Sequence, residues 1–365
     1  MPDQKYATIH YHSYLQLDKI LSAQVLRSAQ VEPKPAHEEM LFIIIHQVYE
    51  LWFKQIAHEV GSVVDMFRAD NVDERSIGTA VGRLNRVIEI QKLLVQQIQV
   101  LETMTPLDFL DFRNYLFPAS GFQSHQFRKV EVMLGLADAN RITYNNKPYT
   151  SEFTENQQHE LLAAASPSLF DLVEDWLERT PFLHFGSFEF LTHYRQAVQN
   201  MLARERQAIE QSHLTDSEKA MRLQMLGGTD TYFQSVLAPE AHSQMQAEGK
   251  LRLSYRATIA ALFINLYRDE PMLHMPFNLL QCLVEIDELL TTWRYRHAQM
   301  VLRMLGRKIG TGGSSGHDYL HATAVKHHIF SDLHNISTLL IPRSELPALP
   351  DEVRRELGFF YTEKK

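Results

Sequence analysis

The sequence contains almost no cysteine. Cys282 is the only one among 365 residues, so no disulfide can form within the chain, and sites that need several thiolates from one chain are excluded. A chain of this kind is typical of the reducing cytoplasm, where we expect this protein to be located. Cys282 lies in the apolar stretch NLLQCLVEIDELL, which favours a buried structural thiol over a nucleophile or an iron ligand.

Long apolar runs and clusters of one charge are also absent. The longest uncharged apolar stretch, residues 40–49, is far too short to span a membrane, and the N-terminus lacks the basic and apolar segments of a signal peptide. The net charge is −8 with histidine neutral, and no basic stripe is present. We therefore expect a soluble intracellular protein that has neither nucleic acid nor membrane as a partner.

Alternating β-strand patterns are missing, and helical periodicity replaces them. Apolar residues recur at spacings of three and four, which predicts an all-α fold. The predicted helices cover residues 14–30, 38–67, 72–102, 121–136, 191–211, 216–246, 254–267 and 277–305. The chain is interpreted as one large bundle-like domain, residues 1–365, with an irregular and polar helical excursion over about 137–250 that contains a shorter helix at 169–178.

Two histidines stand in the middle of strongly apolar helix faces. His46 shares a face with Phe42, Tyr49 and Phe53, at spacings of four, seven and eleven residues from Phe42. By itself this pattern favours a core histidine bonded to a neighbouring group. The apolar face of a second helix carries His297 at its centre, together with Leu290, Trp293, Val301 and Met304.

Two such helices suggest opposite walls of one cavity. A flat, apolar cofactor with a central iron requires walls of this kind, with imidazole as an axial ligand on one side and a polar group on the other. Two unrelated core histidines remain the alternative, because sequence spacing does not bring the two helices together.

A glycine-rich segment and an arginine among aromatic residues are further candidates. The segment GTGGSSG, residues 310–316, holds four of the 15 glycines, and we expect a loop that closes on a ligand rather than an ordinary flexible loop. Arg113 lies among phenylalanines and tyrosine, where it either pairs with Asp108 or Asp111 or binds a ligand carboxylate. The second interpretation predicts an amino acid with an apolar or aromatic side chain as the ligand.

Several long motifs resemble the tryptophan 2,3-dioxygenase family. They are HEEMLFIIIHQVYELWFKQ, LETMTPLDFLDFRNYLFPASGFQS, RLSYRA, WRYRHAQMVLRMLG and GTGGSSG, and the resemblance runs from residue 11 to about residue 343. It implies an all-α homotetramer with one haem b per subunit, whose iron is ferrous in the active state. It also implies the activity: L-tryptophan and O2 give N-formylkynurenine in the first step of the kynurenine pathway.

The resemblance also implies roles for individual residues. His297 matches the proximal iron ligand, and His46 matches the distal histidine that hydrogen-bonds the indole N–H. Arg113 matches the arginine that binds the substrate carboxylate, and Thr311 matches a loop residue that contacts the carboxylate and the ammonium group. The other matching substrate contacts are Phe42, which packs against the indole, Phe109 and Leu116, and the other expected haem contacts are Ser120, Gly121 and Trp293. Tyr11 and Tyr14, in an N-terminal segment of about residues 1–30, match tyrosines that reach into the site of a neighbouring subunit.

The motifs leave three other functions open. A haem monooxygenase of an indole or phenol on the same fold would carry the same two histidines. A haem or tryptophan sensor would use the same loop and arginine without turnover. A non-catalytic helical scaffold would bind no haem.

Overall fold

The structure is a computed structural model that describes residues 8–69, 71–142, 148–306, 308 and 316–358. Within these residues the chain is predominantly helical, so the all-α prediction is confirmed. Its α-helices are α1 (Tyr11–Tyr14), α2 (Leu17–Leu21), α3 (Glu39–Phe67), α4 (Glu74–Leu101), α5 (Pro106–Arg113), α6 (His125–Leu134), α7 (Glu155–Ala165), α8 (Leu169–Glu178), α9 (Phe190–Gln211), α10 (Asp216–Leu237), α11 (Pro239–Ala247), α12 (Tyr255–Leu266), α13 (Pro271–Leu305), α14 (Gly316–Lys326), α15 (Ser331–Asn335) and α16 (Asp351–Leu357). The 3₁₀ turns are η1 (Ser28–Gln30), η2 (Asn114–Leu116), η3 (Gly121–Gln123), η4 (Asp138–Asn140), η5 (Tyr149–Glu152), η6 (Ile336–Leu339) and η7 (Arg343–Glu345).

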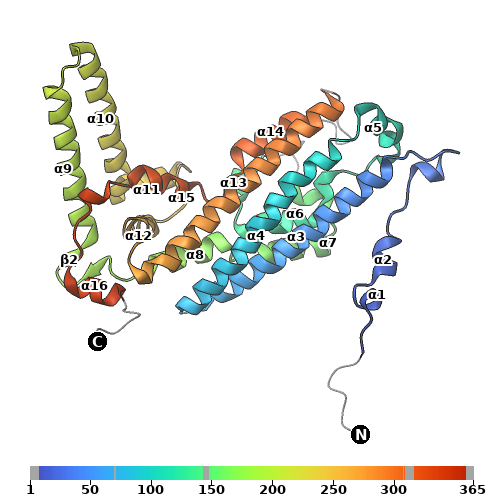
Figure 1. Ribbon diagram of the computed structural model, residues 1–365, viewed down its shortest axis with the longest axis horizontal. Coiled ribbons are helices and arrows are strands. Elements are labelled where there is room, and N and C mark those ends of the chain that lie inside the picture. The colour runs from blue at the N-terminus through green and yellow to red at the C-terminus, as the bar shows by residue number, and fades with distance from the viewer. Residues whose placement is uncertain (1–7, 70, 143–147, 307, 309–315, 359–365) are drawn as a thin grey trace, which may run out of the picture.

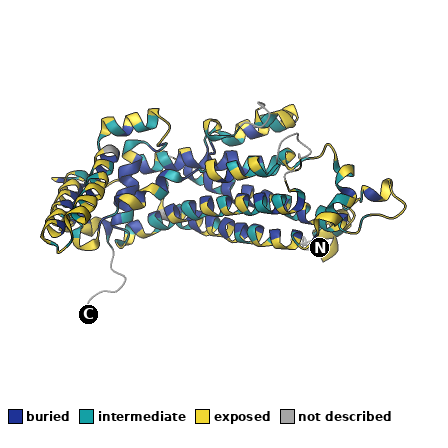
Figure 2. Ribbon diagram, turned by 90° about the horizontal axis from the view of Figure 1, so that it is seen from above, coloured by how far each residue is buried: buried dark blue, intermediate teal, exposed yellow. Residues whose placement is uncertain are grey.

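Three long helices, α3, α4 and α13, lie side by side and form the body of the molecule (Figure 1). Each keeps an apolar stripe along its length, and on α3 the stripe runs through Ile45, Phe53, Val60 and Phe67, all buried. Figure 2 shows the buried positions concentrated where these helices face one another. Burial of the stripes, rather than local helix propensity, holds such long helices in place.

Shorter helices complete the body. Helix α6 packs on α3 and α7, α14 runs along α13, and α8 contacts both α3 and α12. Helices α9 and α10 form a hairpin that projects at one end of the molecule (Figure 1). None of the helices in the described residues is long and apolar enough to cross a membrane.

The only strands among the described residues are β1 (His184–Phe185) and β2 (Phe188–Glu189), which pair antiparallel with His184 opposite Glu189. No strand was expected here, because two residues are too few to show an alternating pattern. The turn between them contains Gly186 with φ of 58°, a left-handed conformation that glycine adopts at low cost.

The prediction of a continuous helix over residues 14–30 is wrong. The segment forms only the short turns α1, α2 and η1, and residues 8–35 are called the N-terminal arm here. Helices α1 and α2 lie apart from the bundle (Figure 1), whereas Gln24 Nε2 donates to Gln47 Oε1 of α3 at 2.6 Å. Helices α1 and α2 bury no residue, and Gln16 between them is left-handed with φ of 53°. A periodic segment without a packed face is too short to remain one helix in water.

Two other predicted helices are divided. The segment 216–246 breaks at Pro239. Proline has no backbone N–H with which to continue the hydrogen bonds of α10, and Pro239 instead occupies the first turn of α11. The segment 121–136 begins as η3, and α6 starts only after Ser124, whose Oγ accepts a hydrogen bond from the Phe127 N–H at 3.2 Å. Ser120 caps η3, since its Oγ accepts from the Phe122 N–H at 3.4 Å.

The long helix α13 starts earlier than expected. Sequence rules placed its start at residue 277, because Pro276 reads as a helix boundary. In the structure Pro271 occupies the first turn, and Pro276 is buried inside the helix. The predicted helix at 169–178 has the bounds of α8, and the Cys282 thiol is buried as expected, which raises its pKa to about 11.

Candidate active site

A cavity of about 340 Å³ lies inside the bundle, between α3 and α13, with α5, α6 and α14 around it. Its wall is mostly apolar, with a few polar side chains that point inward. The predicted site residues that line it are Phe42, His46, Phe109, Arg113, Leu116, Ser120, Gly121, Trp293 and His297. Residues that are far apart in the sequence are thus brought to one site.

The His46 ring has a defined tautomer. Its Nδ1 lies 2.7 Å from the backbone carbonyl oxygen of Phe42, which can only accept a hydrogen bond. Nδ1 therefore carries the proton, and Nε2 of the neutral ring is an acceptor. Burial lowers the pKa of His46, and the bond to Phe42 offsets part of that effect. His46 keeps exposed surface, and its side chain lines the cavity.

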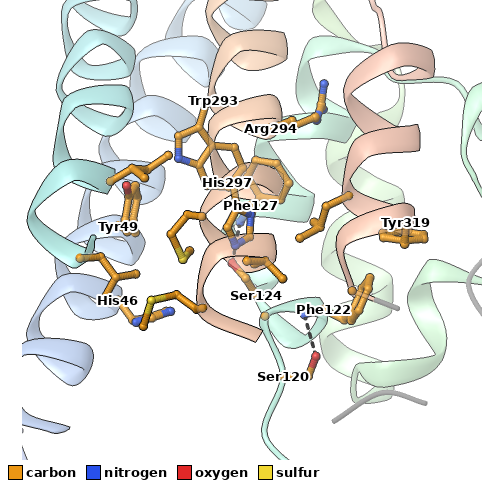
Figure 3. A pocket seen from close by; sticks show the side chains of 18 of the residues that line it. His46, Tyr49, Ser120, Phe122, Ser124, Phe127, Trp293, Arg294, His297 and Tyr319 are labelled. Atoms are coloured by element: carbon orange, nitrogen blue, oxygen red, sulfur yellow. Dashed lines mark hydrogen bonds between the residues drawn. The ribbon is translucent and has the colours of Figure 1, made fainter. Parts of the chain in front are cut away.

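His297 is neutral at physiological pH. Burial, together with a smaller effect of the charge of a protonated His46, lowers the pKa of His297 to about 4. Both rings line the cavity, as predicted. Figure 3 shows His297 reaching from α13 to the middle of the cavity, while His46 lies at the side of α3.

The His297 ring suits an iron ligand. Among the described residues, neither of its ring nitrogens has a hydrogen-bond partner. A neutral imidazole with an unoccupied nitrogen, set in an apolar wall, is the form that binds haem iron. The residues present therefore fit a haem on the His297 side of the cavity.

Aromatic rings hold the His297 helix against α3. The rings of Trp293 and His297 lie 5.3 Å apart, and those of Trp293 and Tyr49 lie 6.0 Å apart. The Tyr49 hydroxyl donates to the Leu94 carbonyl oxygen at 2.8 Å. Burial raises the pKa of Tyr49 to about 12, while the Trp293 N–H lies near enough to lower it slightly without making a direct hydrogen bond. Packing of this kind fixes the orientation of the cavity wall.

Helix α5 brings the arginine to the cavity. The Thr105 Oγ1 accepts from the Asp108 N–H, while the Asp108 carboxylate accepts from the Thr105 N–H at 3.0 Å, which starts the helix at Pro106. Arg113 ends this helix one turn after Phe109, whose ring lies 5.7 Å from that of Phe42. Asp108 is thus engaged in the helix cap, and the Arg113 side chain lines the cavity beside aromatic rings.

The other three predicted site residues are Thr311, Tyr11 and Tyr14. Thr311 lies outside the described residues. Tyr11 and Tyr14 are on α1 in the N-terminal arm, with 72% and 71% of their surface exposed. The arm extends away from the bundle (Figure 1), so these tyrosines do not reach the cavity of their own chain.

The cavity also contains polar residues that sequence reasoning missed. They are Arg128, Glu131, Arg294, Tyr319 and His327. Arg128 and Glu131 are three residues apart in QFRKVEVML, and a charged pair on an apolar helix is a signal that could have drawn attention to them.

The fold and the cavity define a class of protein: an all-α protein with a mostly apolar, aromatic cavity that two histidines line. Comparison with known proteins gives the family. The family model described as "Tryptophan 2,3-dioxygenase" matches residues 2–340. The chain belongs to the tryptophan 2,3-dioxygenase family, as its motifs suggested.

Similar proteins come from bacteria and eukaryotes. The chain is 49% identical over 359 residues to tryptophan 2,3-dioxygenase of Bdellovibrio bacteriovorus, covering 98% of this chain and 100% of that one. It is 46% identical to the enzyme of Dictyostelium discoideum, covering 97% and 89% of the two chains. It is also 46% identical to tryptophan 2,3-dioxygenase B of Danio rerio, covering 95% and 86%.

Proposed function

We propose that this protein is a haem-dependent tryptophan 2,3-dioxygenase that converts L-tryptophan and O2 to N-formylkynurenine, the first step of the kynurenine pathway. Near-full-length similarity to enzymes of that name supports the reaction. The observation that carries the proposal is the pair of neutral histidines facing one apolar cavity, with Arg113 at its wall.

The haem is expected to bind to His297. When bound, haem b supplies the ferrous iron at which O2 is activated for insertion of both atoms across the C2–C3 bond of the indole. The neutral imidazole of His297 would hold the iron, and Trp293, Ser120 and Gly121, which line the same cavity, would contact the haem.

His46 orients the indole in this proposal. Because Nδ1 is held by the Phe42 carbonyl, Nε2 is the nitrogen that can accept the indole N–H. The low pKa keeps the ring neutral and able to accept, so His46 fixes the indole without having to remove its proton. The rings of Phe42 and Phe109 then pack against the substrate and, with Leu116, exclude water from it.

Charged groups fix the other end of the amino acid. The Arg113 guanidinium binds the substrate carboxylate through paired hydrogen bonds. Thr311, in the glycine-rich segment 310–316, contacts the carboxylate and the ammonium group. An amino acid held at both ends would keep its indole ring at a single position in the cavity.

A homotetramer completes the site. We infer that the N-terminal arm carries Tyr11 and Tyr14 into the cavity of a neighbouring subunit, and their exposure in the isolated chain supports this. The arm's Leu21, which is 72% exposed, would gain a partner in the same contact. We further propose that the enzyme works in the cytoplasm, where Cys282 stays reduced.

The test is an aerobic assay of haem-loaded, reduced protein with L-tryptophan. We expect the absorbance of N-formylkynurenine to grow with time. His297→Ala should lose the haem spectrum and the activity, whereas His193→Ala, which changes an exposed histidine of α9, should keep both. A His297→Ala variant with an unchanged haem spectrum would refute the axial role.

A further inference from the structure

A buried cluster of charged side chains lies at the cavity wall, and the proposed binding of tryptophan does not involve it. Its centre is Glu131 on α6, which is fully buried. Glu131 Oε2 accepts from Arg128 Nη1 at 2.7 Å and from Arg141 Nη1 at 2.8 Å, and Oε1 accepts from Arg294 Nη2 at 2.9 Å. The three arginine side chains expose only 9%, 6% and 3% of their surface in that order. We call these four residues the arginine cluster.

His327 adds no charge to the arginine cluster. Its Nε2 accepts from the Ile142 N–H at 3.0 Å, so its proton is on Nδ1, 3.9 Å from Glu131 Oε1. Burial lowers the pKa of His327, which keeps the ring neutral. Its backbone carbonyl accepts from Arg294 Nη1 at 2.8 Å, which fixes the guanidinium in place.

The arginine cluster therefore has more positive than negative charge. Three guanidinium groups share one carboxylate, and the next acid, Asp138, reaches only the outer Arg141 at 3.4 Å and is itself 82% exposed. Buried cations without a counter-charge are costly, so a further anion at this position would be stabilising.

Part of the arginine cluster lies at the wall of the cavity. Arg128, Arg294 and Glu131 line it, whereas Arg141 does not and stacks on the Tyr149 ring at 4.0 Å. In Figure 3, Arg294 lies on the opposite side of His297 from His46. The arginine cluster is thus on the His297 side of the cavity.

The chemistry of the anion follows from this position. An amino acid carries an ammonium group beside its carboxylate, and an excess of buried positive charge would repel that ammonium. Haem b carries two carboxylates on flexible arms and no cation at its edge. We propose that Arg128 and Arg294 bind a haem propionate, so that the arginine cluster fixes the rotation of the macrocycle about the bond to His297.

This inference rests on the proposal that the cavity binds haem, and it can be tested separately. The haem-free protein is titrated with haemin and with haemin dimethyl ester, in which both propionates are blocked, and binding is followed by the haem absorbance. A charge-assisted hydrogen bond contributes enough that wild-type protein should bind the ester about tenfold or more weakly than haemin.

Variants distinguish the arginines that line the cavity, Arg128 and Arg294, from Arg141, which does not line it. Arg128→Gln and Arg294→Gln should each reduce the preference for haemin over the ester by about tenfold, and Arg128→Lys should restore part of it. Arg141→Gln is the matched control, because Arg141 contacts the same carboxylate but not the cavity. It should lower the unfolding midpoint and leave the preference for haemin unchanged.

The outcomes are distinct. If Arg294→Gln does not fold, the comparison of Arg128→Gln with Arg141→Gln decides the inference. Equal binding of haemin and its ester by wild-type protein would overturn it, and so would a full preference for haemin in Arg128→Gln. Failure to bind either form would instead overturn the proposed haem site itself.

Discussion

Replacement of His46 by alanine tests how the cavity recognises the indole. The structure predicts one hydrogen bond, from the indole N–H to His46 Nε2, because Nδ1 is already bonded to the Phe42 carbonyl. A neutral hydrogen bond contributes about 1 kcal/mol net, so the dissociation constant for L-tryptophan should rise about fivefold. Loss of ring packing adds to this, since the His46 and Phe42 ring centroids lie 4.1 Å apart.

A substrate analogue separates the hydrogen bond from the packing. In the benzothiophene analogue of tryptophan a sulfur atom replaces the indole N–H, so it cannot donate to His46. Wild-type protein should bind tryptophan about fivefold more tightly than the analogue because of this bond, and His46→Ala should remove the difference. Binding is measured by titration of the haem spectrum in haem-loaded protein.

The control is chosen from the same chain. His193 on α9 makes the same local bond, from Nδ1 to the carbonyl of Glu189 at 2.7 Å, but lies on the surface. His193→Ala should leave both affinities unchanged. An unchanged preference for tryptophan in His46→Ala would refute the assigned hydrogen bond. Loss of all turnover with intact binding would show that His46 is an essential base, contrary to this account.

Three further variants test other parts of the structure. Arg113→Gln should raise KM for L-tryptophan by about tenfold to a hundredfold, because the carboxylate loses its paired bond, and an unchanged KM would contradict that role. Glu39→Ala should lower the free energy of unfolding by about 2–5 kcal/mol in urea titrations, because the buried carboxylate accepts from the Arg27 N–H at 2.7 Å and from the Ser28 N–H at 2.9 Å. Proteolysis of the N-terminal arm should quicken in the same variant, and equal cleavage rates would contradict the anchoring. The neighbouring arginines hold the pKa of Glu131 well below its ordinary value of 4.5. The ionised carboxylate should therefore stabilise the fold above pH 4.5, and this contribution should be lost as the pH falls through the lowered pKa. The stability difference between wild type and Glu131→Gln should therefore shrink in acid unfolding, and a constant difference would refute it.

The sequence carried a clear signal for part of the site. His46 and His297 were identified because a polar ring stands in the middle of an apolar face on each of two separate helices, although one such ring alone favours an ordinary core histidine. The same rule singled out Arg113 among aromatic residues, and the structure places all three at one cavity. Each signal is local to one helix, which is why it could be read before the fold was known.

Other features depend on contacts between distant segments. The arginine cluster joins Glu131 on α6 to Arg294 on α13 and to His327 beyond α14, and no local pattern relates these residues. Periodicity also does not show whether an apolar helix face packs against another element. Residues 14–30 were therefore expected to form one helix, but they form short turns. Pro276 misled in the opposite way, because α13 continues through this proline, which lies buried inside the helix.

The most direct test of the central claim uses haem-loaded, reduced protein, L-tryptophan and ¹⁸O2, with the product analysed by mass spectrometry immediately after mixing. The account predicts N-formylkynurenine with both oxygen atoms labelled. A product with a single labelled oxygen would contradict it and indicate a monooxygenase. A haem spectrum that responds to tryptophan without any product would indicate a sensor.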